Sequence, residues 1–352
     1  MSENNPTTET TAATETTVAD PLKTHEVREL AHRRPLLCCR YDPTGNVIAA
    51  GSQDALVVRW DLESDAKTEL SAHDSWVKAV AFSRDAATLL SGGCDGRLIW
   101  WENSSQATQP VRTVEAHQGW IRALDVSPDG TLIASGGNDN RVKVYRIDSG
   151  EQVADLSAHE SNVYSLLFHP EGQILLSGDL GGVVHQWDVS SGKLVRSFDA
   201  KKLKNYNGGQ RVHYGGVRSL TLSADLTRLA AGGLHKATNP LGNVQEPLVL
   251  EFNWESGEEQ RALEIGETTS LSISRAIYHP AGFLMAATCY RDCLLLFWND
   301  EATTVFHKHK LAGGAVDMDL HPDGLQVAIA HTDSKSFGPQ PPSHLRISRL
   351  SA

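Results

Sequence analysis

The sequence predicts an all-β fold built from repeated units of short strands. Three segments align with one another: SAHDSWVKAVAFSRDAATLLSGGCDGRLIWWEN from Ser71, EAHQGWIRALDVSPDGTLIASGGNDNRVKVYRI from Glu115, and SAHESNVYSLLFHPEGQILLSGDLGGVVHQWDV from Ser157. The histidine near the start of each unit recurs after 41, 44 and 42 residues when the count begins at His32. A period in the low forties is typical of a β-propeller, in which each unit supplies about one blade.

Each unit reads as short strands separated by turns. Apolar residues alternate with polar ones over runs of about five residues, which is the period of a half-buried strand. Pro128-Asp129-Gly130 separates the first two strands of one unit, and Asp95-Gly96 separates the second and third strands of another. Asp and Gly favour tight turns between antiparallel strands. We therefore expect four-stranded antiparallel blades.

The ends of the units carry a recognisable signature. Trp60-Asp61 and Trp187-Asp188 close two of them, and Ser-Gly-Gly precedes the turn in others. With these residues the chain resembles the WD-repeat family of β-propellers. Weaker units continue from His213, Ser272 and Gly314, and together with the unit from His32 they make seven. The resemblance implies a seven-bladed propeller over residues 23–352.

The two ends of the chain are expected to meet in the last blade. Only three strands of the seventh unit precede Ala352, while the segment His25 to Leu30 matches the fourth strands of other units. An open ring would leave two unpaired strand edges, and an N-terminal strand that joins the last blade removes them. The sequence thus predicts a ring closed by its N-terminal strand.

Residues 1–22 differ from the rest of the chain. They are rich in Thr and Glu, contain no aromatic residue, and carry acidic side chains with no basic one to oppose them before Lys23. Such a composition cannot bury enough apolar surface to fold. We expect a disordered tail of residues 1–22 followed by one propeller domain.

Composition and charge narrow the classes of function. The chain of 352 residues has 32 basic and 43 acidic side chains, a net charge of −11, and no apolar run long enough to span a membrane. Generic nucleic-acid binding is therefore a poor default. Five cysteines without disulfide or zinc-site spacing favour a reducing cytoplasm. We expect a cytoplasmic protein without a membrane partner, either a monomer or a subunit of a larger complex.

Polar residues recur at fixed offsets in three consecutive units. They are His73, Ser91, Asp95 and Trp101, then His117, Ser135, Asp139 and Tyr145, then His159, Ser177 and Trp187. A reader could take such a His, Ser and Asp set for a hydrolase triad, but a nucleophilic site is assembled once and not in every repeat. The resemblance implies instead a buried hydrogen-bond network that fastens each blade.

Some units depart from this pattern. Ala50 replaces Ser in the first unit, Gly181 replaces Asp in the fourth, and Ser348 occupies the Trp position in the seventh. These blades are expected to lack a complete network.

No catalytic, metal or cofactor site is expected. The Gly pairs at 92–93 and 136–137 belong to the repeat and do not precede a helix, so they do not form a phosphate-binding loop. The fifteen histidines suggest a metal site only by their number, and no carboxylate or thiol at ligand spacing completes a site around His307 and His309. The alternative of an enzyme that uses the central channel would need a special cluster in one unit, which the sequence does not offer.

Three insertions interrupt the later units: Asp199 to Val212, Leu234 to Glu246 and Thr332 to Ser343. In the family's geometry the connections that they lengthen share one rim, the top face. Long loops within a compact fold are frequently functional. Tolerated drift in solvent-facing loops is the competing interpretation.

Aromatic and basic residues flank the first apolar position of several units, and the family's geometry places them on the same rim. They are Trp76, Lys78, Trp120, Arg122, Asn162, Tyr164, Arg218 and, near a later turn, Arg291. Aromatic residues and Arg dominate binding hot spots, and cations attract acidic or phosphorylated segments. The sequence thus predicts a non-enzymatic scaffold that binds a peptide or loop of a partner protein on the top face.

Two other interpretations stay open at this point. Trp76 and Trp120 would have no binding role if they only packed against neighbouring loops. A nucleic-acid-associated factor would draw on Lys201, Lys202 and Lys204 in the first insertion. Strong salt dependence of nucleic-acid binding would distinguish that function.

Overall fold

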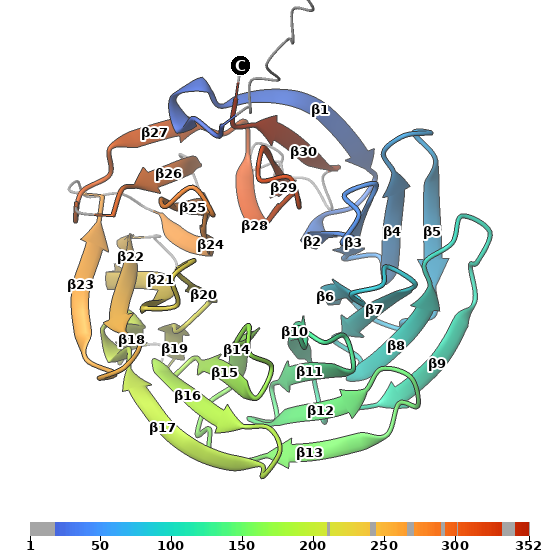
Figure 1. Ribbon diagram of the computed structural model, residues 1–352, viewed down its shortest axis with the longest axis horizontal. Helices are drawn as coiled ribbons and strands as arrows, with labels where there is room; N and C mark the ends of the chain where they lie inside the picture. Colours follow the sequence, from blue (N-terminus) through green and yellow to red (C-terminus); the bar gives the residue numbers. More distant parts are fainter. Residues whose placement is uncertain are drawn as a thin grey trace, which may run out of the picture.

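The fold is a ring of seven four-stranded antiparallel sheets (Figure 1). The computed structural model describes residues 18–209, 212–239, 244–265, 271–289, 293–300, 302–332 and 342–351. Each sheet is one blade, and its first strand lies nearest the central axis. The prediction of an all-β, seven-bladed propeller with four-stranded antiparallel blades is confirmed.

Blades one to three follow one another in the first half of the chain. Blade one contains β2 (Leu36–Tyr41), β3 (Val47–Ser52), β4 (Leu56–Asp61) and β5 (Lys67–Ser71). Blade two contains β6 (Val77–Phe82), β7 (Thr88–Gly93), β8 (Arg97–Glu102) and β9 (Pro110–Glu115). Blade three contains β10 (Ile121–Val126), β11 (Leu132–Gly137), β12 (Val142–Arg146) and β13 (Gln152–Leu156).

Blades four to six continue the ring. Blade four contains β14 (Val163–Phe168), β15 (Ile174–Asp179), β16 (Val183–Asp188) and β17 (Lys193–Asp199). Blade five contains β20 (Ser219–Leu222), β21 (Arg228–Asn239), β22 (Val244–Asn253) and β23 (Glu259–Glu264). Blade six contains β24 (Ser272–Tyr278), β25 (Leu284–Cys289), β26 (Leu294–Trp298) and β27 (His307–Lys310).

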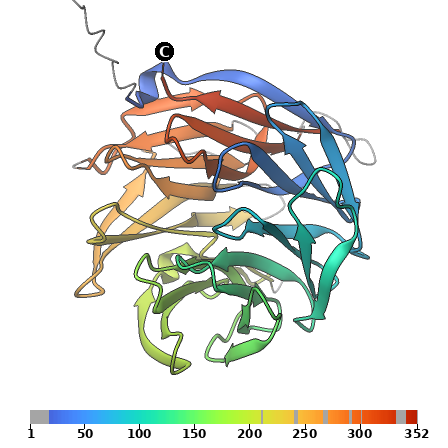
Figure 2. The ribbon, with the colours of Figure 1, turned by 45° about the vertical axis from the view of Figure 1, so that its right-hand side comes forward.

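Blade seven combines both ends of the chain. Its three inner strands are β28 (Gly314–Leu320), β29 (Gln326–Thr332) and β30 (Ser343–Arg349), and its outermost strand is β1 (His25–His32). β1 runs antiparallel to β30, with Leu30 opposite Leu345. Figures 1 and 2 show this N-terminal strand lying along the outside of the last blade. The backbone groups of β30 therefore have a partner strand on both sides.

The residues just before β1 also contact the end of the chain. The short 3-10 helix η1 (Pro21–Lys23) is capped by Asp20, whose side chain accepts a hydrogen bond from the Leu22 amide. The amide of Asp20 donates to the carbonyl of Leu350 at 2.5 Å. The end of the expected 1–22 tail thus lies against blade seven, while residues 1–17 lie outside the described residues.

The described insertions form additional β-structure beside blade five. The second 3-10 helix, η2 (Lys201–Leu203), leads into a hairpin of β18 (Lys204–Asn207) and β19 (Val212–Gly215). The side chain of Asn205 accepts a hydrogen bond from the Ala237 amide at 3.1 Å and donates to the Leu234 carbonyl at 3.3 Å. The first two predicted insertions therefore pack against each other. Most of the third insertion lies outside the described part of the chain.

In the part of the chain that the structure describes, neither of the two 3-10 helices could cross a membrane.

Apolar side chains fill the spaces between adjacent blades. One cluster joins Trp100 of blade two to Ile133 and Tyr145 of blade three, and another joins Phe198 of blade four to Phe252 of blade five. A blade has two apolar faces, so it is stable only between two neighbours. This packing explains why the repeats close into a ring.

The innermost strands share a local irregularity that positions the functional residues. In six of them the pairing with the second strand skips one residue near the start, as between Val77 and Ala79 or between Ile121 and Ala123. A β-bulge of this kind redirects the side chain that it leaves out of the ladder. The skipped residue is Lys78 in blade two and Arg122 in blade three.

Candidate functional site

A chain of polar hydrogen bonds crosses the interior of blade two. Trp101 Nε1 donates to Ser91 Oγ at 2.8 Å, and Ser91 Oγ lies 2.8 Å from His73 Nε2. His73 Nδ1 lies 3.0 Å from Asp95. Because a carboxylate only accepts, the neutral imidazole donates from Nδ1 and accepts the Ser91 proton at Nε2. Every member of the set is satisfied, and none is left as a free nucleophile or base.

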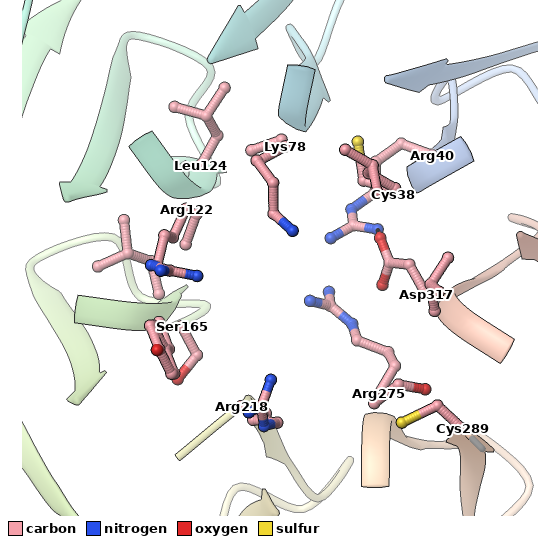
Figure 3. Close-up of a pocket in the computed structure, with 17 residues that line it drawn as sticks. Cys38, Arg40, Lys78, Arg122, Leu124, Ser165, Arg218, Arg275, Cys289 and Asp317 are labelled. Carbon is pink, nitrogen blue, oxygen red and sulfur yellow. Dashed lines mark hydrogen bonds and ion pairs between the residues drawn. The ribbon is translucent and has the colours of Figure 1, made fainter. Parts of the chain in front are cut away.

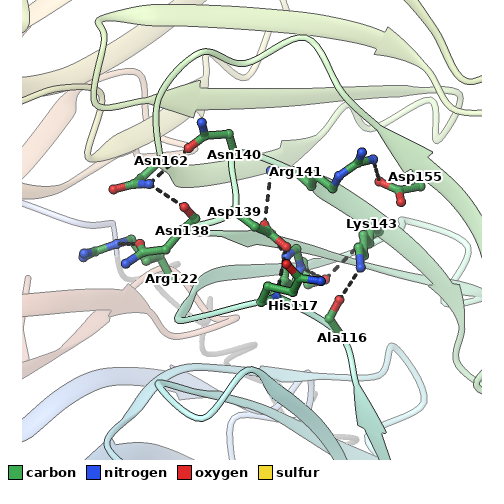
Figure 4. Close-up of polar contacts among 12 residues, drawn as sticks. Ala116, His117, Arg122, Asn138, Asp139, Asn140, Arg141, Lys143, Asp155 and Asn162 are labelled. Carbon is green, nitrogen blue, oxygen red and sulfur yellow. Dashed lines mark hydrogen bonds and ion pairs between the residues drawn. The ribbon is translucent and has the colours of Figure 1, made fainter.

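Blade three repeats most of this network. His117 lies 2.8 Å from both Asp139 and Ser135 (Figure 4). Tyr145 differs from the expectation, because among the described residues no hydrogen bond joins it to Ser135, whose hydroxyl lies 2.8 Å from His117 Nε2. Tyr145 packs edge-on against Trp100, with ring centroids 6.5 Å apart. It therefore fills the Trp position by packing.

Blade four has a complete network, and the expectation that Gly181 interrupts it is wrong. Asp179, two residues earlier in the chain, lies 2.9 Å from His159 Nδ1. Ser177 lies 2.6 Å from His159 Nε2 and accepts from Trp187 Nε1 at 2.8 Å. The last residue of β15 thus supplies the carboxylate that the turn supplies in blades two and three.

The predicted partner-binding residues of blades two to five form a continuous series of ring and cation contacts. The rings of Trp76 and Trp120 lie 6.3 Å apart, and their side chains are 41% and 36% exposed. The guanidinium of Arg122 lies 4.9 Å from the centre of the Trp120 ring and 4.3 Å from that of Tyr164. The guanidinium of Arg218 lies 5.4 Å from the centre of the Tyr164 ring and ends the series. We call these five residues the aromatic-cation series.

Polar contacts hold the middle of this series in place. Arg122 Nε donates to Asn138 Oδ1 at 2.5 Å (Figure 4). Asn162 donates to the Asn138 carbonyl at 2.6 Å and to Asn140 Oδ1 at 3.1 Å. Asn162 therefore supports the turn under Arg122 and has little donor capacity left for a partner. Its contact with a partner stays a prediction, and within the chain Asn162 positions the turn.

Of the four predicted cations, the three that the structure describes point into the central channel and not outward over the rim. Figure 3 shows Lys78, Arg122 and Arg218 directed toward a common space. The cavity there has a volume of about 240 Å³. Its charged lining residues are Arg40, Lys78, Arg122, Arg218, Arg275 and Asp317. Five cations and one carboxylate face this space in a protein whose net charge is −11.

Burial and crowding of like charges affect the protonation of the lining residues. Burial lowers the pKa of Lys78, and the nearby Arg122 and Arg218 lower it further. Burial also lowers the pKa of Arg122 and of Arg275. The cationic forms are thus held close together at an energetic cost.

The two thiols at the cavity do not offset this charge. Burial raises the pKa of Cys38 to about 12 and also raises that of Cys289. Both are therefore neutral near pH 7 and are weak nucleophiles.

Sequence reasoning missed two of the five cations that line the cavity. Arg275 lies two residues after the first buried position of its strand, Ile273, and Arg40 lies four residues after the corresponding Leu36. Lys78, Arg122 and Arg218 instead directly follow the first apolar residue of their units, so the pattern that singled out those three residues could not find Arg275 or Arg40. Arg291, the last predicted partner-binding residue, lies outside the described residues.

Within the described ranges, no group of three or more His, Cys, Asp or Glu side chains is arranged to hold a metal ion.

A protein-family model agrees with the repeat pattern. The model described as "WD domain, G-beta repeat" matches residues 24–61, 65–102, 108–146 and 150–188. Each match begins with the outermost strand of one blade and continues with the three inner strands of the next, so the first match starts at β1. The sequence repeat is therefore offset from the blade by one strand, which is why β1 is left to complete blade seven.

Two curated relatives align with short parts of the chain. The "WD repeat, SAM and U-box domain-containing protein 1" of Danio rerio is 30% identical over 79 residues, which are 22% of this chain and 16% of that protein. The "Small ribosomal subunit protein RACK1y" of Oryza sativa subsp. japonica is 37% identical over 68 residues, which are 18% of this chain and 20% of that protein. The alignments thus span about a fifth or less of either relative.

Proposed function

The chain is a WD-repeat β-propeller, and we propose that it is a non-enzymatic scaffold that binds an acidic segment of a partner protein across its top face. Propellers of this family typically serve as platforms for protein interaction. A fold alone does not specify a partner. The nature of the partner is therefore argued from the surface chemistry of blades two to five.

The aromatic-cation series is the observation that carries this function. Trp76 and Trp120 expose about two-fifths of their side chains beside a group of cations. The two rings contact each other at a tilt, and the Trp120 ring lies against Arg122, so these side chains are already held in place. A preorganised aromatic surface loses little conformational entropy when a segment binds to it. Trp, Tyr and Arg are also the residue types that most often dominate binding energy.

Charge selects the kind of segment. Lys78, Arg122 and Arg218 face the central cavity, and among the described residues none of them forms an ion pair with an acidic side chain. A partner carboxylate or phosphate would supply the missing negative charge, whereas a basic segment would be repelled. Because the whole chain has a net charge of −11, an acidic segment is expected to approach at this cationic face and to be repelled elsewhere.

The polar networks support a scaffold in place of an enzyme. His73, His117 and His159 each lie between a Ser and an Asp inside a blade, where the side chains are buried. A substrate cannot reach a nucleophile in that position. A hydrolase assignment from these residues would therefore require the blades to open.

Nucleic-acid binding has less support. Lys201 and Lys202 of the first insertion lie within ion-pair distance of Asp199 and Glu259. Two of the three lysines that suggested such a function are thus paired with carboxylates of the chain. We further propose that the protein acts in the cytoplasm, since none of its five cysteines forms a disulfide bond.

The experiment compares partner capture by the purified full chain and two variants. The first variant combines Trp120→Ala with Arg122→Glu, which removes an exposed ring and reverses a channel charge. The second combines Leu194→Ala with Lys193→Glu on the exposed outer strand β17, where Leu194 is 42% exposed. The two variants change charge equally and each removes one exposed apolar side chain.

We expect the wild type and the β17 variant to capture the same acidic proteins and the Trp120/Arg122 variant to lose them by roughly tenfold or more. Synthetic acidic peptides from the captured proteins should bind directly with the same order of affinity among the three chains. Equal capture by all three would refute the top-face assignment.

A further inference from the structure

The cavity at the centre of the ring, which we call the channel mouth, is lined by more positive charge than contacts within the chain neutralise. Of its five cations, Arg40 has a carboxylate partner, Asp317, at 2.6 Å. The other four are called the channel cations: Lys78, Arg122, Arg218 and Arg275. In the part of the chain that the structure describes, none of these four forms an ion pair. Four cations from four different blades therefore converge, and among the described residues none has an ion-pair partner of its own.

Two of the channel cations also lack hydrogen-bond partners. Arg218 Nε and Arg275 Nε are buried from solvent, and neither has a partner among the described residues. A buried N–H without an acceptor costs about 1 to 3 kcal/mol, and more when the group is charged. Such a cost at two positions of one cavity indicates that an acceptor with several oxygen atoms belongs there.

The nearby carboxyl groups are occupied with structural contacts. Asp125 accepts the Phe168 amide of the next blade at 2.6 Å, and Asp319 accepts the Tyr41 amide at 2.8 Å. Burial raises the pKa of both carboxyls. Asp317 accepts from the Cys39 amide in addition to pairing with Arg40. These acids thus connect adjacent blades, and they act on Arg275 through space without forming an ion pair with it.

The cavity has the size and rigidity of a site for a small ion. Its volume of about 240 Å³ is below the range of about 300–1,000 Å³ that is common for drug-sized ligands. The guanidinium of Arg122 lies against Trp120 and Tyr164, and that of Arg218 lies against Tyr164, so both are positioned before a ligand arrives. Arginine in a fixed orientation recognises phosphate by paired N–H bonds.

We propose that the channel mouth binds a phosphoryl group carrying about two negative charges, held by the four channel cations (Figure 3). A carboxylate has a single charge and two oxygens in one plane. A phosphoryl group presents three oxygens and a charge of about −1.5 to −2, which suits donors that approach from several sides. The phosphoryl group belongs either to a phosphorylated side chain of a bound segment or to a free polyanion, and only the first source rests on the proposed function.

The first measurement titrates inorganic pyrophosphate into the purified full chain at a constant salt concentration of about 0.15 M. We expect one binding event per chain and a rise in melting temperature with pyrophosphate concentration, since a ligand that binds only the folded state stabilises it. Lys78→Met and Arg275→Gln should each weaken binding by roughly tenfold or more. Lys193→Met on the exposed strand β17 is the matched control and should bind like the wild type.

Melting without ligand separates a binding role from a structural one. Lys78 stands among like charges, so Lys78→Met should melt at the same temperature as the wild type or higher when no anion is present. The same variant should lose the stabilisation by pyrophosphate. Absence of pyrophosphate binding to the wild type, or equal affinity in Lys78→Met, Arg275→Gln and Lys193→Met, would overturn the site.

A competition measurement identifies whether the phosphoryl group comes from a partner's side chain or from a free polyanion. An acidic peptide with one phosphoserine, its unphosphorylated form, and inositol hexakisphosphate are each tested for displacement of pyrophosphate. Displacement by the phosphopeptide and not by its unphosphorylated form assigns the site to a partner's side chain. Displacement by the inositol phosphate alone assigns it to a free polyanion.

One further variant distinguishes binding of the anion from capture of a protein partner. Trp76→Ala removes an exposed ring without changing charge, so it should weaken partner capture and leave pyrophosphate affinity unchanged. Retained capture in Trp76→Ala and in the Trp120/Arg122 variant would contradict the scaffold proposal alone. Lost pyrophosphate binding in the wild type would contradict the anion site alone.

Discussion

Blades two to four and blades five to seven have the same strand order but different interiors. In blades two and four a serine, Ser91 or Ser177, joins a Trp to a His at the centre of the sheet. The strand register places Ala231, Ala286 and Ile329 at the same position in blades five, six and seven. The ring is nevertheless continuous in every blade. Strand pairing and packing between blades therefore suffice for the propeller, and the polar networks add stability to particular blades.

The two regions also differ at the channel mouth. The skipped residue of each β-bulge is Lys78, Arg122 and Tyr164 in blades two to four, whereas it is Ser274 and Val316 in blades six and seven. The half of the ring with regular networks thus carries most of the proposed binding chemistry. A rigid blade holds its inner strand, and hence the bulged side chain, in a fixed orientation.

The largest expected effect comes from removing the strand that joins the two regions. A chain that begins at Arg33 lacks β1 and leaves the backbone of β30 unpaired along one edge. We expect it to lose a large fraction of the about 5–15 kcal/mol that typically stabilises a domain. Chemical denaturation of this chain is compared with that of a chain lacking only residues 1–17. Equal unfolding free energies would mean that β1 does not contribute to ring closure.

A second difference between the regions is their response to mild acid. His331 of blade seven is 4% exposed. Its pKa is lowered to about 4 by burial, and Arg346 and His344 of β30 lower it further, while a hydrogen bond to the Gly313 carbonyl and the nearby Glu29 of β1 oppose this. The unfolded chain therefore takes up a proton at higher pH than the folded chain.

Because the pKa of His331 is lower in the folded chain, its contribution to the free energy of unfolding is fully present above about pH 6.5. The free energy of unfolding then declines as the pH falls toward 4, by up to about 3 kcal/mol. His331→Asn keeps a donor for Gly313 and cannot titrate in this range. The unfolding free energy of the variant, measured from pH 7 to pH 4, should decline less than that of the wild type. Parallel curves would show that His331 does not cause the decline.

The network of blade two is tested by removing its carboxylate. Asp95→Ala leaves His73 Nδ1 without its acceptor and also removes the acceptor of the Asp74 amide. We expect a loss of about 1 to 3 kcal/mol in the free energy of unfolding. Asp74→Ala, an exposed neighbour outside the network, is the control. An unchanged denaturation midpoint for Asp95→Ala would show that the network is not stabilising.

The smallest expected effect is a gain in blade six. Trp298 is 1% exposed, and its Nε1 has no hydrogen-bond partner among the described residues. Ala286 stands where Ser91 and Ser177 accept from the corresponding Trp in blades two and four. Ala286→Ser should therefore stabilise the protein by about 1 kcal/mol. Ala287→Ser places a hydroxyl on the opposite face of the same strand and should give no gain, and a gain of equal size there would contradict the assignment.

Much of the fold was predictable because its determinants are local. The spacing of His32, His73, His117 and His159, the turn at Asp95-Gly96 and the alternation of apolar residues all lie within single units. The structure has a turn at Asp95-Gly96, where Gly96 has φ +81° and a Cβ would lie 2.3 Å from the His117 carbonyl oxygen. Only glycine fits there.

Other details needed more than the pattern of one unit. Asp179 takes the place expected for residue 181 because the carboxylate reaches the same histidine from the end of β15. The contacts between Asn205 and residues 234 and 237 depend on how two distant insertions fold onto each other. Neither arrangement leaves a periodic signal in the sequence.

The sequence by itself determined the number of units, their strand and turn pattern, the His–Ser–Asp contacts of blades two and three, and the need for an N-terminal strand in the last blade. Each follows from chemistry repeated at short range. Only the tertiary structure decided that Arg40, Lys78, Arg122, Arg218 and Arg275 face one space. Most of these residues are tens of positions apart, and they meet because the inner strands of a closed ring surround the same axis.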